Sequence, residues 1–163
     1  KSNNYAIIVD IDETILDNSR YQIILNESDQ KFTQESWSEW VKKEKAGLVP
    51  GAKQFLAKMR KLGVRIIFIS NRMDENLEPT IKNFKNLKIF SKDDIFLLRL
   101  DKKDKKTVRR AEIFKQAGRM ADYPAFEVIG FLGDAYGDFP KDNDKYTWDL
   151  NCYLFPNPMY GKW

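Results

Sequence analysis

Residues 5–14 read Tyr-Ala-Ile-Ile-Val-Asp-Ile-Asp-Glu-Thr, an apolar run that ends in two aspartates one residue apart. The run is rich in β-branched residues and does not alternate with polar ones, which favours a strand covered on both faces of a parallel sheet. Ligands of such sheets collect beyond the carboxyl ends of the strands. The sequence therefore predicts a ligand site at Asp10 and Asp12, with turn and helix-cap roles as the alternative.

Two ionised carboxylates at one strand end repel each other unless a bound cation or a shared proton compensates them. A hard divalent ion such as Mg2+ prefers oxygen ligands and can also hold a substrate phosphate. The motif around Asp10 and Asp12 is therefore compatible with a magnesium site.

The composition narrows the chemistry that the chain can use. Its 163 residues, 42% of them hydrophobic, suffice for one core and predict a single domain. The net charge of +4 attracts anions mildly and does not indicate a nucleic-acid partner. The chain has no histidine, which excludes phosphohistidine chemistry, Ser-His-Asp triads and histidine zinc sites. Catalysis must then rely on carboxylates, hydroxyls, lysines or a metal.

Cysteine usage and hydropathy add two exclusions. Cys152 is the single cysteine, so no intrachain disulfide is expected, and its apolar surroundings predict a small core residue. No stretch reaches the roughly 18 apolar residues of a transmembrane helix, and no signal peptide is visible. Because the sequence begins at Lys1 without a methionine, we expect a processed or trimmed N-terminus.

Hydrophobic patterning predicts a three-layer α/β fold, Rossmann-like, with a mainly parallel sheet and helices on both faces. Further strands are expected at residues 64–69, 95–98 and 126–132, with an edge strand at 152–155. Start and stop signals predict helices from Pro50 to Leu62, from Pro79 to Leu87, and from a cap at Asp104 to Gly118. The apolar side of the last helix is expected to carry Val108, Ala111, Phe114 and Ala117.

The polar section from about Asn18 to Leu48 is predicted to be a small helical cap over the site. Within it, Ser36-Trp37-Ser38-Glu39 has the spacing of a capping box and could begin a short helix.

Polar motifs follow the other predicted strands. Ser70-Asn71-Arg72 could cradle an anion, although serine and asparagine are also common at ordinary strand ends. Asp134 and Asp138 could complete an oxygen-rich metal site, with Gly133 allowing close approach of the backbone, or they could form a tight turn. A lysine at the beginning of the last helix should lie near these groups, and position alone leaves Lys102, Lys103, Lys105 and Lys106 open.

In their order along the chain, these motifs resemble the four motifs of the haloacid dehalogenase-like (HAD) superfamily. The finer likeness is to the class C acid phosphatases, bacterial lipoprotein phosphatases that include surface 5′-nucleotidases. The stretches that carry this finer likeness span nearly the whole chain, at residues 12–19, 37–41, 49–52, 111–113, 133–139 and 156–163.

The resemblance implies a mechanism for the two aspartates. Asp10 would attack phosphorus and form an aspartyl-phosphate. Asp12 would protonate the leaving oxygen and then activate the water that breaks the intermediate. Since Asp12 must carry a proton when it acts as the acid, an acidic pH optimum is expected.

The resemblance also assigns the metal and phosphate ligands. Mg2+ would be bound by the carboxylates of Asp10 and Asp134 and by the main-chain carbonyl of Asp12, with Asp138 acting directly or through water. Ser70 and Lys106 would hold the phosphoryl oxygens. Lys106 is chosen because residues 106–109 match a lysine followed three positions on by an arginine, with Lys103 and Lys105 as alternatives.

The substrate implied is a small phosphomonoester, with a nucleoside 5′-monophosphate favoured. Trp37 and Tyr160 match positions that flank the base in the family, which suggests a stacking clamp. The alternative is that both rings are structural, Trp37 in the cap helix and Tyr160 in the tail. Asn71 and Arg72 are expected to support the substrate site rather than to act in catalysis directly.

Family members usually carry a signal peptide, a lipidated cysteine and a helical segment before the first motif, whereas nine residues precede Asp10 here. An extracytoplasmic lipoprotein and a homodimer are therefore expectations from kinship alone.

Two rival functions stay open. One is another reaction on the same scaffold, by a dehalogenase, a phosphomutase or a kinase-linked phosphatase. Asp12 argues against a dehalogenase, which has no leaving oxygen to protonate. The other is a surface module that binds nucleotide or phosphate without turnover.

Overall fold

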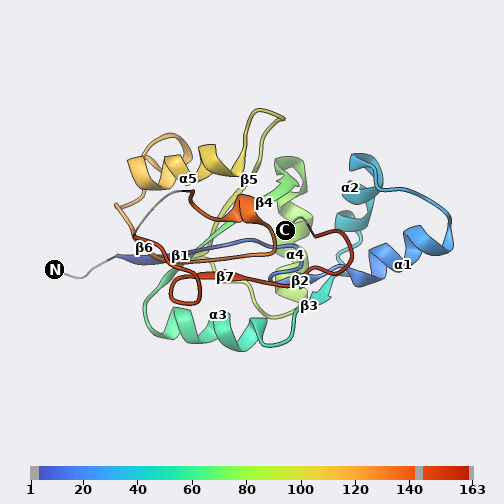
Figure 1. Ribbon diagram of the computed structural model, residues 1–163, viewed down its shortest axis with the longest axis horizontal. Helices are drawn as coiled ribbons and strands as arrows, with labels where there is room; N and C mark the ends of the chain where they lie inside the picture. The colour runs from blue at the N-terminus through green and yellow to red at the C-terminus, as the bar shows by residue number, and fades with distance from the viewer. Residues whose placement is uncertain (1–3, 142–144, 162–163) are drawn as a thin grey trace.

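The computed structural model describes residues 4–141 and 145–161 and has the predicted three-layer α/β architecture (Figure 1). Lys162 and Trp163, the end of the tail that resembles the family, lie outside the described residues. Five parallel strands form the central sheet in the order β5-β4-β1-β6-β7. They are β1 (Tyr5–Val9), β4 (Arg65–Met73), β5 (Ile95–Arg99), β6 (Glu127–Gly133) and β7 (Cys152–Leu154).

Strand β1 lies in the middle of the sheet, as its apolar run predicts. It pairs in parallel with β4 on one side and with β6 on the other. Residues 6–9 are all buried. Strand β7 is the predicted edge strand, and Cys152 is a buried core residue with a free thiol.

Strand β4 is longer than predicted. It continues through Ser70, Asn71 and Arg72 to Met73, and its pairing with β5 shifts register between Ile69 and Met73. The motif expected in the loop after the strand is therefore held in extended backbone at the sheet edge, which directs alternate side chains to opposite sides.

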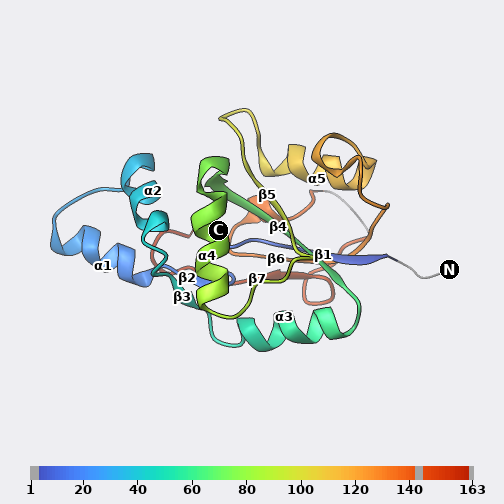
Figure 2. The same cartoon turned by 180° about the vertical axis from the view of Figure 1, so that it is seen from behind.

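Helices cover both faces of the sheet (Figure 2). Helices α3 (Ala52–Lys61) and α4 (Leu77–Asn86) pack on one face, with Leu56 and Phe84 in the core there. Helix α5 (Lys106–Lys115) covers the other face with Ile113. Short 3-10 turns lie at η1 (Asp74–Asn76), η2 (Gly118–Met120) and η3 (Tyr136–Asp138). Within the described ranges, no helix is both long and apolar enough to cross a bilayer.

Two predicted helix beginnings are corrected. Helix α3 has Gly51 as its N-cap, with φ of 85°, so Pro50 precedes the helix instead of lying in its first turn. Helix α5 has Lys105 as its N-cap, and the Asp104 carboxylate accepts from the Leu100 amide at 2.9 Å instead of capping the helix. Helix α5 also ends at Lys115, before Gly118, because Gln116 adopts a left-handed conformation.

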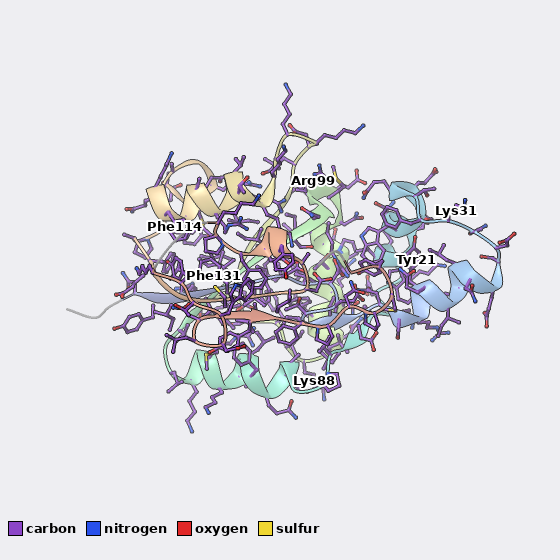
Figure 3. All side chains as sticks on the ribbon, viewed as in Figure 1. Tyr21, Lys31, Lys88, Arg99, Phe114 and Phe131 are labelled. Atoms are coloured by element: carbon purple, nitrogen blue, oxygen red, sulfur yellow. The ribbon has the colours of Figure 1, made fainter. Side chains whose placement is uncertain are left out.

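The predicted buried side of α5 is wrong. Val108 and Phe114 are each 47% exposed, while Arg109, Arg110 and Ile113 are buried. Figure 3 labels Phe114 on α5 and Phe131 in the sheet beneath it, and their ring centroids are 6.5 Å apart. The arginine-bearing side of α5 faces the protein interior because carbonyl groups at the strand ends need buried hydrogen-bond donors. Apolar periodicity in the sequence does not indicate this need.

The insertion, defined here as residues 18–46, differs from the single short helix predicted. Strands β2 (Leu16–Asp17) and β3 (Gly47–Leu48) pair antiparallel and bring its two ends together. It contains α1 (Ser19–Glu27) and α2 (Gln34–Lys42). Helix α1 was missed because it buries only Tyr21 and Leu25 and leaves two isoleucines exposed.

The capping box of α2 lies three residues earlier than predicted. Thr33 is the N-cap, its hydroxyl accepts from the Ser36 amide at 3.0 Å, and the Ser36 hydroxyl accepts from the Thr33 amide at 3.2 Å. Ser36 thus closes the box from inside the helix, where glutamate or glutamine is the usual residue.

Candidate active site

A pocket of about 870 Å³ opens where the carboxyl ends of β1, β4 and β6 meet the insertion. It brings together all the site residues predicted from the sequence, which come from six separate segments of the chain. These lining residues are Asp10, Asp12, Trp37, Ser70, Asn71, Arg72, Lys106, Asp134, Asp138 and Tyr160.

Asp10, Asp134 and Asp138 form a buried group of carboxylates in this pocket. One oxygen from each lies within 4.8 Å of the other two. Burial raises the pKa of Asp10 well above its usual 3.8, and the neighbouring carboxylates add to the effect against the opposing charge of Lys106. Burial likewise raises the pKa of Asp134. A hard divalent cation would remove this crowding of negative charge, so the donor set fits Mg2+.

Gly133 allows the side chain of Asp138 to lie against the backbone beside Asp134. The Oδ2 atom of Asp138 accepts from the backbone amides of Asp134 and Ala135, each at 3.1 Å. A Cβ atom added at Gly133 would lie 2.3 Å from the Cβ of Asp138. Glycine is therefore needed for the close approach that the sequence predicted.

Lys106 is the lysine that reaches the carboxylates. Its Nζ lies 2.5 Å from Oδ1 of Asp10 and also contacts Oδ1 of Asp138. Lys105 lines the pocket at its exposed rim, and Lys103 is exposed in the preceding turn. Burial alone would lower the pKa of Lys106, but the charges of Asp10 and Asp138 outweigh it and raise the pKa to about 12.

Asp12 has different partners from Asp10, although only one residue separates them. The guanidinium of Arg72 donates to Asp12 from Nη2 at 2.7 Å and from Nε at 3.1 Å. Asn18 donates from Nδ2 at 2.9 Å, and the Ser70 hydroxyl lies 3.4 Å from Oδ2. The side chain of Asp12 is thus oriented by neutral and positive donors and stays outside the group of three carboxylates.

Arg72 supports Asp12 from within the protein. It is 1% exposed, and its Nη1 donates to the hydroxyl of Thr80 at 3.0 Å. Its guanidinium carbon also lies 5.8 Å from the ring centroid of Trp37. Asn71, by contrast, is exposed and accepts from Nη2 of Arg109 at 2.8 Å.

Sequence reasoning did not identify Asn18 as part of the site. Its side chain is fully buried, and its Oδ1 accepts from the indole of Trp40 at 2.9 Å while its Nδ2 donates to Asp12. The backbone amide of Asn18 donates to Glu13 at 2.8 Å, and burial raises the pKa of Glu13 to about 8. In the sequence, the feature that could have indicated this role of Asn18 is its position as a short polar residue just after the first motif.

In the sequence, Arg109 served only to identify Lys106, as the arginine that follows this lysine by three positions. Its side chain is completely buried and contacts the carbonyl of Ser70, and it donates to the carbonyl of Leu97 at 3.1 Å. Burial lowers the pKa of Arg109 to about 10. Arg109 therefore ties α5, and with it Lys106, to the ends of β4 and β5.

Asn157 connects the tail to the carboxylates. Its Nδ2 donates to Oδ2 of Asp134 at 2.7 Å, and its Oδ1 accepts from the backbone amides of Met159 and Tyr160, each at 3.2 Å. These bonds place Tyr160, which is 42% exposed, on the wall of the pocket.

Trp37 and Tyr160 differ in exposure. Trp37 is 8% exposed and packs edge-on against Tyr21, with ring centroids 5.1 Å apart. Figure 3 labels Tyr21 within the insertion. Trp37 therefore has a packing role in addition to its position on the pocket wall.

Comparisons with known proteins identify the family of this chain. The chain matches the HAD superfamily, subfamily IIIB (Acid phosphatase), over residues 1–163. Its structure is similar to a class C acid phosphatase from Bacillus anthracis with tungstate bound, with a TM-score of 0.79 and 29% identity. That match covers 99% of this chain and 70% of the other. A Pnkp1/Rnl/Hen1 complex shares the fold, with a TM-score of 0.62 at 18% identity over 48% of that chain.

The curated relatives include plant proteins. A Stem 31 kDa glycoprotein of Glycine max is 24% identical over 97% of this chain, and Acid phosphatase 1 of Solanum lycopersicum is 24% identical over 94%. The chain spans 60% and 57% of the length of these two relatives. The resemblance found in the sequence is confirmed by the match over residues 1–163, and this chain belongs to the acid phosphatase subfamily, IIIB, of the HAD superfamily.

Proposed function

We propose that this protein is a Mg2+-dependent acid phosphatase that hydrolyses phosphomonoesters through an aspartyl-phosphate on Asp10. The observation that supports it most directly is the separation of roles at the end of β1. Asp10 is surrounded by carboxylates and Lys106, while Asp12 is held by Arg72 and Asn18. One carboxylate is thus suited to metal-assisted attack and the other to proton transfer.

Asp10, Asp134 and Asp138 would hold the metal, together with the main-chain carbonyl of Asp12. When bound, Mg2+ supplies charge neutralisation for the phosphoryl oxygens and orients them for transfer. The burial of these three carboxylates strengthens their interaction with a cation, because water screens the charges less in the interior.

In the first step, an oxygen of Asp10 forms a bond to phosphorus as the ester P–O bond breaks. Asp12 gives its proton to the leaving oxygen, so an alcohol departs. In the second step, Asp12 takes a proton from water, the water oxygen attacks phosphorus, and Asp10 is released. The donors from Arg72 and Asn18 hold Asp12 in one orientation through both steps.

Ser70 and Lys106 would contact the phosphoryl oxygens. The Ser70 hydroxyl accepts from the Arg72 amide at 3.1 Å and donates to Oδ2 of Asp12 at 3.4 Å. Rotation of this hydroxyl would direct its hydrogen to a phosphoryl oxygen of the substrate. Lys106 would supply a fixed positive charge where negative charge develops. Asn71 and Arg72 would keep these groups in position.

We further propose that the insertion is a cap and that the favoured substrate is a nucleoside 5′-monophosphate, with the base between Trp37 and Tyr160. The half-exposed ring of Tyr160 on the pocket wall supports this choice. Stacking contributes roughly 1 to 3 kcal/mol per base. Tyr160→Ala should therefore raise KM for nucleotides about tenfold and change KM for p-nitrophenyl phosphate much less. Equal effects on both substrates would exclude the clamp.

Phosphate release tests the proposed reaction itself. Nucleoside monophosphates and p-nitrophenyl phosphate are incubated at acidic and neutral pH with Mg2+ or with EDTA. We expect metal-dependent turnover that is fastest at acidic pH and is abolished in Asp10→Asn. The matched control is Asp122→Asn, which removes an exposed carboxylate. A folded wild-type protein that binds Mg2+ without turnover would instead support a binding module.

A further inference from the structure

The rim of the active-site pocket carries three cations that the proposed reaction does not use. Arg99 lies at the end of β5, Lys105 at the N-cap of α5, and Lys141 follows η3, and all three line the pocket. We propose that they form a second anion subsite and that, within the proposed class of 5′-phosphate substrates, those with a second phosphate group on the leaving part of the molecule are preferred. This inference rests on the proposed phosphatase function.

The carboxylates that line the pocket are already engaged. Asp10 and Asp138 contact Lys106, Asp12 is paired with Arg72, and Asp134 accepts from Asn157. All four of these aspartates lie at the site of proposed chemistry. No other acidic residue among the described residues lines this pocket. The rim cations therefore lack a carboxylate partner within the lining.

Arg99 is held in place for such a role. Its Nε donates to the carbonyl of Asp101 at 3.0 Å, and its Nη2 donates to the carbonyl of Lys102 at 3.1 Å. These two bonds leave three N–H groups of the guanidinium for a ligand. Figure 3 labels Arg99 at the foot of the β5–α5 loop. A planar, preoriented guanidinium is well suited to bind phosphate oxygens in pairs.

The acid nearest in sequence does not neutralise Arg99. The Oδ1 atom of Asp101 accepts from the backbone amides of Lys103 and Asp104, at 2.6 and 3.0 Å, and so stabilises its own turn. The positive charge of Arg99 also affects a second arginine inside the protein. After burial and the charge of Arg119, it contributes to the lowered pKa of Arg109. Three cations that lack a carboxylate partner in the pocket lining therefore favour an anionic ligand at the rim.

The size of the pocket leaves room for such a substrate. A volume of about 870 Å³ lies in the usual range for pockets that enclose whole small molecules. A single phosphate bound at Lys106 and Ser70 would leave the rim cations unpaired. A second phosphate on the leaving group would place anionic oxygens at both ends of the pocket, which favours bisphosphorylated substrates over monophosphates.

Two substrate pairs test the inference. The first is adenosine 3′,5′-bisphosphate against adenosine 5′-monophosphate, and the second, without an aromatic base, is glucose 1,6-bisphosphate against glucose 6-phosphate. The measured quantity is the ratio of kcat/KM within each pair. We expect the wild-type protein to favour the bisphosphate about tenfold in both pairs, the effect of one hydrogen bond between charged groups. Added salt should lower both ratios because it screens exposed charges.

The triple substitution Arg99→Ala, Lys105→Ala and Lys141→Ala should bring both ratios close to one. The control is Lys103→Ala, which removes an exposed cation from the same loop without touching the pocket lining, and it should keep the wild-type ratios. Ratios near one in a wild-type protein that hydrolyses p-nitrophenyl phosphate would overturn this inference alone. If the triple variant kept the wild-type ratios, the assignment of the second anion subsite to these three cations would be wrong. Absence of turnover in a folded wild-type protein would overturn the proposed function and this inference together.

Discussion

Asn18 donates a hydrogen bond of 2.9 Å from its side-chain amide to Oδ1 of Asp12. The same side chain accepts from the indole of Trp40 in α2 at 2.9 Å. A residue at the beginning of the insertion therefore contacts both the proposed acid of the reaction and the helix of the insertion. This link makes the orientation of Asp12 depend on how the insertion is folded.

Replacing Asn18 by alanine should reduce both stability and turnover. The indole of Trp40 would lose its acceptor in a buried position, which costs about 1 to 3 kcal/mol of unfolding free energy. Asp12 would lose one of the donors that orient it, so kcat should fall by about tenfold or more. Urea unfolding and phosphate release measure the two effects.

The comparison variant for Asn18 is Trp40→Phe, which removes the indole donor and keeps the bond from Asn18 to Asp12. It should lower stability with a smaller loss of kcat. If both variants lost kcat to the same extent, the role of Asn18 in orienting Asp12 would be wrong.

Replacing Lys106 by methionine should move turnover and metal affinity in opposite directions. The positive charge that Lys106 places beside Asp10 and Asp138 would be lost, so the carboxylate group becomes more negative. Mg2+ should then bind more tightly, while kcat falls by about 100-fold or more because the phosphoryl oxygens lose a fixed charge. Calorimetric titration with Mg2+ and initial rates test both signs, with Lys103→Met as the control for an exposed lysine. Weaker Mg2+ binding would contradict this account.

Replacing Gly133 by alanine should disrupt the turn that carries Asp138. The added Cβ would meet Asp138 at 2.3 Å, so the backbone or the carboxylate must move. We expect a loss of about 1 to 3 kcal/mol in unfolding free energy, typical of overpacking, together with weaker Mg2+ binding. Gly137→Ala is the matched control, because a Cβ there meets nothing within 4 Å. Equal behaviour of the two variants in thermal unfolding and Mg2+ titration would rule out the steric explanation.

The ion pair of Glu112 and Arg119 should make stability depend on pH on the acid side. Arg119 donates to both carboxylate oxygens, at 2.7 and 3.0 Å, and this bonding lowers the pKa of Glu112 below 4.5. The folded state therefore holds the ionised form more firmly than the unfolded chain does. The stabilisation is complete above pH 4.5 and is lost as the pH falls through the lower folded pKa.

Thermal unfolding of Glu112→Gln across this pH range tests that sign. The variant should have a lower Tm than the wild-type protein at neutral pH, and the difference should shrink as the pH falls below 4.5. Glu39→Gln is the control, since the pair of Glu39 with Lys42 is exposed and should contribute little at any pH. A difference that grows toward acid would contradict the assignment.

Much of the fold follows from patterns that are local in the sequence. The unalternating run before Asp10 indicates a central parallel strand because both of its faces must be buried, and β1 lies in the middle of the sheet. Apolar runs that stop at Asp10, Ser70 and Asp134 place these residues at one edge, because parallel strands end on the same side. The predicted site residues accordingly line one pocket.

The sequence could not determine contacts that depend on which helix face turns inward. Apolar periodicity assigned Val108 and Phe114 to the buried side of α5, but buried Arg109 satisfies the carbonyls of Ser70 and Leu97. The need for buried donors to these carbonyls arises only after strand ends that are distant in the sequence have been brought together. In the insertion, α1 was missed because it buries few of its apolar residues, and the capping role of Thr33 was missed because Ser36 stands where glutamate or glutamine is usual.

The sequence by itself determined the sheet, the order of the motifs and the chemical character of the site, because hydrophobic periodicity and strand-end carboxylates are local properties. Only the tertiary structure decided that Lys106 reaches Asp10, that Asn18 and Arg72 hold Asp12, and that Asn157 ties the tail to Asp134. These are contacts between side chains from different segments, and their distances depend on how the elements pack.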